Sequence, residues 1–159
     1  MTPFHFSLHR WWQNMGFGIQ SKTDFNFLND IIRETHPYYI YNVLKTSYPQ
    51  YSNKEHKRAQ LLYRLCYNLR NEELYLTGHY SDLEKHAIRE ALICTPTFHH
   101  IIPDIKQDCV YIVKDINKEN KTYWEELIRQ NTVTFDMVNI GIAFTYSNRY
   151  PEHYKILSR

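Results

Sequence analysis

The side chain best placed for chemistry is Asp115, which follows an unbroken apolar stretch at 109–113. An apolar run without alternation predicts a strand that is covered on both faces. In helix-flanked sheets, ligands bind outside the carboxyl ends of the strands. Asp115 is therefore the candidate catalytic acid, although it could equally cap the helix that follows. Lys114 beside it argues against a metal site built from two carboxylates.

The candidate for contact with a cofactor is Gly78, the one glycine at a strand-to-helix turn. Loops that bind phosphates or dinucleotides need several glycines, so that the backbone can approach the ligand at a helix N-terminus. Here His79 and Tyr80 follow the glycine, and both carry bulky rings. The residues favour an ordinary turn over a binding loop.

A metal site is not expected. His99 and His100 are adjacent, so on a strand they would point to opposite faces. The three cysteines are odd in number, far apart and without a CxxC pair, which is typical of buried free thiols in a reducing compartment. They are Cys66, Cys94 and Cys109. With no secretory signal pattern and no apolar stretch of membrane-spanning length, we expect a cytoplasmic location and no membrane partner.

Composition favours one globular domain over residues 1–159, with 43% hydrophobic and 23% charged residues. Aromatic residues reach 16%, including 14 tyrosines, which suits half-buried sites and interfaces. The net charge is only +2. The densest basic stretch, 54–70, falls on a predicted helix, where a solvated polar face explains it; its cations are Lys54, Lys57, Arg58, Arg64 and Arg70. A nucleic-acid partner is therefore not expected.

The spacing of the apolar residues, and the Gly and Pro residues that separate the apolar segments, predict an α/β fold with a mixed sheet. Ser81 and Glu84 form a capping box at the start of one helix, and Asn117 can cap another. Helices are expected at 23–34, 55–69, 81–94 and after Asn117, and strands at 73–77, 98–102, 109–113, 133–137, 140–146 and 154–157. Residues 1–53 then form a helical, aromatic N-terminal extension, residues 54–159 an α/β core, and 133–146 a C-terminal β-hairpin.

Three segments occur in an order that resembles a known family. The first comprises Arg10-Trp11-Trp12, Gly16-Phe17-Gly18-Ile19 and the aromatic stretch 36–41; the second is 110–116; the third is 122–126 followed by 133–146. Together they resemble class I S-adenosylmethionine-dependent methyltransferases of a bacterial, Bacteroidetes-type group. In that group similar segments form an N-terminal extension, a strand that ends in paired acids, and a closing helix with a β-hairpin.

The departures from this family bear on function. The resemblance implies an acidic, glycine-rich cofactor loop, but 75–80 holds one glycine and no acid. The paired acids are reduced to Lys114-Asp115, and 81–108 is too short for the family's usual series of strand–helix units. We therefore expect a reduced Rossmann-like, methyltransferase-like sheet and no bound cofactor.

The expected function is non-catalytic: an interaction subunit or a vestigial relative of the methyltransferases. One alternative is a divergent methyltransferase that binds S-adenosylmethionine and uses Asp115 and the Tyr38-Tyr39 region near a small-molecule acceptor. The second alternative is a small nucleic-acid-binding module.

A protein partner or a second copy of the chain is expected to bind through aromatic residues. Losing strand–helix units should leave an edge or a face that longer relatives cover, and such surfaces are commonly paired. The candidates are Trp11, Trp12, Tyr38 and Tyr39, and we expect a homodimer.

Overall fold

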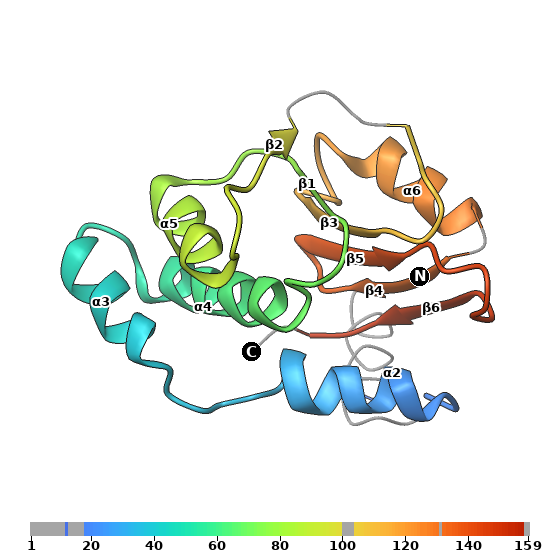
Figure 1. Ribbon diagram of the computed structural model, residues 1–159, viewed down its shortest axis with the longest axis horizontal. Helices are drawn as coiled ribbons and strands as arrows, with labels where there is room; N and C mark the ends of the chain where they lie inside the picture. The colour runs from blue at the N-terminus through green and yellow to red at the C-terminus, as the bar shows by residue number, and fades with distance from the viewer. Residues whose placement is uncertain (1–11, 13–17, 100–103, 131, 158–159) are drawn as a thin grey trace, which may run out of the picture.

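The structure is a computed structural model that describes residue 12 and residues 18–99, 104–130 and 132–157 (Figure 1). Trp11, one of the predicted partner-binding residues, lies outside the described residues, as do His100 and, in the first resembling segment, Arg10, Gly16 and Phe17. No helix in the described ranges is both long and apolar enough to cross a membrane.

The described residues form one mixed sheet of six strands, in the order β2-β1-β3-β5-β4-β6. The strands are β1 (Leu74–Thr77), β2 (Phe98–His99), β3 (Val110–Lys114), β4 (Val133–Asp136), β5 (Ile140–Phe144) and β6 (Glu152–Lys155). β3 runs parallel to β1 and antiparallel to β5, and β6 runs parallel to β4. The α/β fold with a mixed sheet is thus confirmed, including the β4–β5 hairpin.

β3 is the central strand that its apolar run predicts. It pairs with β1 on one side and β5 on the other, and all five of its residues are buried. Tyr111 and Val113 face α6, whereas Val110 and Ile112 belong to the apolar cluster on the opposite face. Both faces are therefore covered, which is why the sequence shows no alternation here.

Helices cover the two faces of the sheet unequally (Figure 1). α6 (Lys121–Arg129) packs on one face, where the Trp124 ring lies so close to Gly141 of β5 that a Cβ there would approach it to 2.5 Å. The other face carries α4 (Asn53–Asn68), α5 (Asp82–Ala91) and the N-terminal elements. These are α2 (Lys22–Phe27), the π-helical turn η1 (Leu28–Ile32) and, farther out, α3 (Tyr39–Ser47).

Two local predictions are wrong. α6 begins at Lys121 with Asn120 in the N-cap position, because the Asp115 carbonyl accepts the backbone N–H groups of both Lys118 and Asn120 and closes a turn there. Asn117 is therefore exposed ahead of the helix and does not cap it. Cys66 and Cys109 are buried as expected, but Cys94 is exposed because α5 ends three residues earlier, at Ala91.

The solvated polar face predicted for 54–70 is wrong at Arg64, which is buried. Its guanidinium donates hydrogen bonds to the carbonyls of Ile31 (3.0 Å) and Ile32 (3.1 Å) and to the Tyr41 hydroxyl (3.2 Å). These carbonyls end η1, where the helix leaves them without partners in its own backbone. Arg64 therefore joins the N-terminal elements to α4.

Replacing Arg64→Met should destabilise the fold by about 2–4 kcal/mol, because the two carbonyls lose charged donors within a buried region. Urea denaturation followed by circular dichroism measures the change. The control is Arg89→Met at an exposed position of α5, which should shift stability by less than about 0.5 kcal/mol. Equal stabilities for the two variants would contradict the bridging role.

Candidate functional site

The carboxyl ends of β1, β3 and β4 meet at one edge of the sheet. Asp115 follows β3 there, and the turn from Met137 to Asn139 joins β4 to β5 beside it. The backbone N–H of Asp115 donates to the carbonyl of Asn139 at 2.7 Å, which holds the loop and the turn together. This is the edge at which the sequence places the candidate acid.

A cleft of about 510 Å³ opens between this edge and α4. Lys54, Lys57, Arg58 and Leu61 recur at helical spacing and present one face of α4 to it. Its full lining comprises these four residues with Asp115, Asn117, Lys118, Met137, Val138, Asn139 and Ile140. Its volume lies in the range of small-molecule sites.

The cleft is basic. Four cations line it against one carboxylate, that of Asp115. Within the described residues, Lys54, Lys57 and Lys118 have no carboxylate at ion-pair distance. Their like charges are held around one hollow, an arrangement that attracts an anion.

Two backbone positions at the cleft are unusual. Asp115 has φ 58° and Val138 has φ 73°, so both occupy the left-handed region that side chains rarely adopt. Val138 is β-branched, for which this conformation costs the most, and its backbone N–H is held by the Asp136 carboxylate at 2.8 Å. Conformations of this kind cluster at functional sites, where the surrounding structure enforces them.

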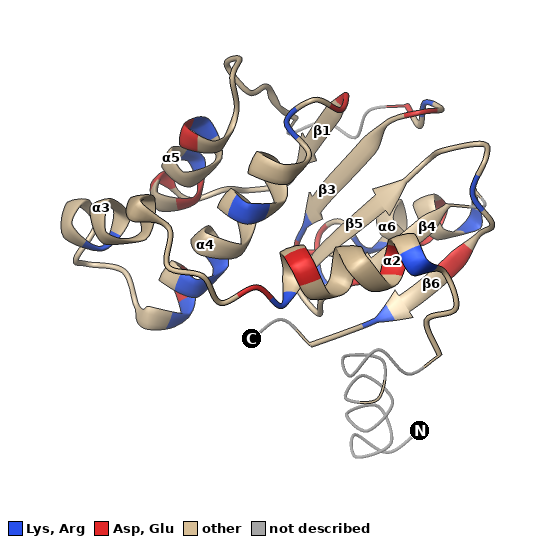
Figure 2. Ribbon diagram, turned by 60° about the horizontal axis from the view of Figure 1, so that its bottom comes forward, with Lys and Arg blue, Asp and Glu red and all other residues tan. Residues whose placement is uncertain are grey.

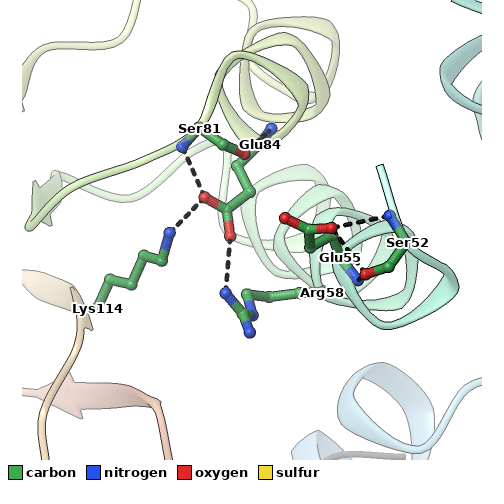
Figure 3. Close-up of polar contacts among 6 residues, drawn as sticks. All are labelled: Ser52, Glu55, Arg58, Ser81, Glu84 and Lys114. Carbon is green, nitrogen blue, oxygen red and sulfur yellow. Dashed lines mark hydrogen bonds and ion pairs between the residues drawn. The ribbon is translucent and has the colours of Figure 1, made fainter. Parts of the chain in front are cut away.

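A buried carboxylate, Glu84, connects the cleft to the neighbouring helix (Figure 3). One of its oxygens accepts the Lys114 ammonium at 2.5 Å and the backbone N–H of Ser81 at 2.7 Å. The other lies 3.7 Å from the guanidinium of Arg58. Ser81 caps the backbone N–H of Glu84 in return, which confirms the predicted capping box.

Tyr80 completes the buried side of this cluster. Its hydroxyl donates to the Ile112 carbonyl at 3.0 Å, and the Lys114 ammonium lies 5.7 Å from its ring centroid. Burial raises the pKa of Tyr80 well above its ordinary value. The phenol is therefore neutral and acts as a hydrogen-bond donor, with no role as a base.

Gly78 and Asp115 come to the same edge, but Gly78 does not line the cleft. Its φ is +117°, and a Cβ on it would lie 3.0 Å from the Lys114 Cβ and 3.1 Å from the Asn120 amide nitrogen. That amide donates to the Lys114 carbonyl at 2.7 Å. Gly78 thus allows the turn after β1 to pack against the loop after β3.

The described aromatic candidates for partner binding differ in exposure. Tyr39 is 84% exposed and Trp12 is 52% exposed. Tyr38 instead packs against Tyr41 and Tyr63, with both ring centroids 5.4 Å away, and donates to the Glu34 carboxylate at 2.8 Å. Burial and this carboxylate raise the pKa of Tyr38 to about 12.

A larger cleft, of about 920 Å³, lies at the opposite edge of the sheet. Its buried acid, Asp24, forms an ion pair with Arg149 and accepts a hydrogen bond from the Tyr154 hydroxyl at 3.0 Å. The pair fixes α2 to the segment before β6, which is a structural role. The basic cleft, where three lysines have no carboxylate at ion-pair distance among the described residues, is therefore the better candidate site.

Sequence patterns did not predict that the four cations and Asp115 gather at one cleft. Asp115 and the basic face of α4 are each visible in the sequence, but Lys118 and Asn139 carry no signal that links them to the site. The available signal was the spacing of Lys54, Lys57, Arg58 and Leu61, in which cations share a helix face with an apolar residue.

Comparisons with known proteins give no match among family models, curated proteins or solved structures. Within the described ranges, no group of three or more His, Cys, Asp or Glu side chains could hold a metal ion.

Replacing Glu84→Gln should destabilise the fold by about 3–5 kcal/mol, because it leaves the Lys114 ammonium buried without a counter-charge while keeping the cap acceptor. The double variant with Lys114→Met should recover much of this loss. Urea unfolding of both singles and the double measures the coupling.

The matched control is Glu125→Gln, which removes the exposed 3.9 Å pair with Lys121 and should cost less than about 1 kcal/mol. Additive effects of the Glu84 and Lys114 substitutions would show that the two side chains do not depend on each other.

Proposed function

We propose that the chain is a methyltransferase-like protein without methyl-transfer activity, which acts by binding. The observation that carries the proposal is the packing at the end of β1. In the resembling enzymes a glycine-rich loop there holds the cofactor, whereas here the turn at Gly78 is filled on one side by Lys114 and Asn120. This close packing supports the proposal that the turn does not hold S-adenosylmethionine.

The remaining acids at this edge support the same proposal. The Glu84 carboxylate is occupied by the backbone N–H at the N-cap of α5, by the Lys114 ammonium and by the Arg58 guanidinium. Asp115 is the one carboxylate in a cleft that four cations line, an arrangement that suits the binding of an anion. The helix and hairpin of the third resembling segment are built as α6 with β4 and β5, which supports the reduced Rossmann-like interpretation. The cytoplasmic location stays a prediction.

S-adenosylmethionine at about 1 mM should leave the melting temperature unchanged. A ligand present at a hundred times its Kd would stabilise the fold by about 2.7 kcal/mol, which a thermal melt detects readily. Adenine at the same concentration is the control. A rise in melting temperature with S-adenosylmethionine alone would favour the alternative, a divergent methyltransferase that uses Asp115.

The binding role includes self-association. Tyr39 exposes most of a large apolar ring at the start of α3, a surface type enriched in interfaces. We expect light scattering at micromolar concentration to give twice the 19.4 kDa chain mass, and Tyr39→Ser to shift the protein toward the monomer.

Tyr150→Ser is the control for this experiment, because Tyr150 is 91% exposed but lies at the opposite edge of the sheet. It should leave the dimer intact. A monomeric unsubstituted protein would rule out the homodimer.

A further inference from the structure

We infer that the basic cleft between α4 and the loop after β3 binds a small organic phosphate that carries hydroxyl groups. The inference goes beyond the proposed function, because it holds whether or not the chain has lost catalysis. It rests on four features of the cleft: three lysines that have no carboxylate at ion-pair distance among the described residues, one lining carboxylate, its size and its buried apolar side chains.

The cations define the phosphate end of the ligand. Lys54 and Lys57 come from α4, and Lys118 comes from the loop after β3, so the charges converge from two elements. These ammonium groups repel one another in the cleft. A dianionic phosphate placed among them would remove this repulsion and accept charge-assisted hydrogen bonds from them. The Arg58 guanidinium lies 3.7 Å from the Glu84 carboxylate. This ion pair orients the guanidinium but is not a short contact, so other N–H groups of Arg58 can donate to the phosphate.

The polar side chains define the hydroxyl end. Asp115 is partly exposed, and within the described residues its carboxylate accepts no hydrogen bond. A carboxylate repels phosphate but accepts hydrogen bonds from hydroxyl groups. Asn117 and Asn139 add amide donors and acceptors to the lining. The ligand must therefore be bifunctional.

The shape of the cleft favours a small molecule over a nucleic acid. Leu61, Met137 and Ile140 are buried and form an apolar floor beneath the charged rim. Figure 2 shows several basic residues along α4, with basic and acidic residues interspersed over the other elements. A nucleic-acid site would instead show a basic stripe and a clearly basic domain, whereas the net charge is +2.

Isothermal titration calorimetry with ribose 5-phosphate, ribose and inorganic phosphate tests the inference on the full chain. We expect ribose 5-phosphate to bind at least about tenfold more tightly than inorganic phosphate, because both ends of the cleft are used. Ribose alone should give no measurable heat. Affinity for ribose 5-phosphate should fall as salt rises.

Variants of the cations locate the site. Lys57→Met and Lys118→Met should each raise the Kd for ribose 5-phosphate about tenfold, since each removes a charged donor. Lys45→Met is the matched control: it makes the same change on α3, at an exposed lysine outside the cleft, and should leave the Kd unchanged. Thermal melts verify that all three variants are folded.

Asp115→Asn separates the two ends of the ligand. Asparagine tolerates the left-handed backbone at this position, so the loop should keep its shape. The variant should bind inorganic phosphate more tightly, because a repulsive charge is gone, and should lose the preference for ribose 5-phosphate over inorganic phosphate. A merely structural Asp115 would move both affinities in the same direction.

Three results would overturn the inference: no binding of ribose 5-phosphate up to about 10 mM, an equal loss of affinity in Lys45→Met, or tighter binding of a short single-stranded oligonucleotide with a steep salt dependence. The last would indicate a nucleic-acid surface. Binding of S-adenosylmethionine would contradict the proposed function but not this inference, so the two fail separately.

Discussion

The buried carboxylate of Glu84 is the contact on which the arrangement of α4, α5 and β3 depends. It caps α5, neutralises Lys114 at the end of β3, and orients Arg58 on α4. A carboxylate taken out of water is tolerated only when charges and donors surround it. All three elements must therefore hold their relative positions for Glu84 to remain buried, and this requirement fixes the basic face of α4 opposite Asp115.

The core elements could be predicted because each depends on local patterns. The apolar run of β3, the amphipathic α4 and the Ser81–Glu84 cap are encoded within a few residues, and the structure builds all three. The failures arise where distant contacts override local preference. The sequence predicts a solvated helix face around Arg64. The side chain is buried instead, because the Ile31 and Ile32 carbonyls at the end of η1 need hydrogen-bond donors.

The site was predictable only in part, for a similar reason. The place of Asp115 follows from strand periodicity, and Gly78 was predicted only to lie in a strand-to-helix turn. What Gly78 does there depends on the loop after β3, which packs against it and is separated from it by more than thirty residues. The gathering of lysines around Asp115 likewise depends on how α4 crosses the sheet edge, and helical spacing alone does not contain that information.

Lys114 connects the departure from the methyltransferase pattern with the local structure. An acid at this position would lie beside the buried Glu84 and repel it, whereas lysine supplies the counter-charge that Glu84 requires. The same lysine packs against Gly78 and narrows the turn after β1. A single side chain thus stabilises the junction of α5 with β3 and also packs beside the turn at which the resembling family has its cofactor loop. On the other side of β3, at the cleft against α4, lie Asp115 and the three lysines that have no carboxylate at ion-pair distance among the described residues. A ligand is therefore expected in that cleft.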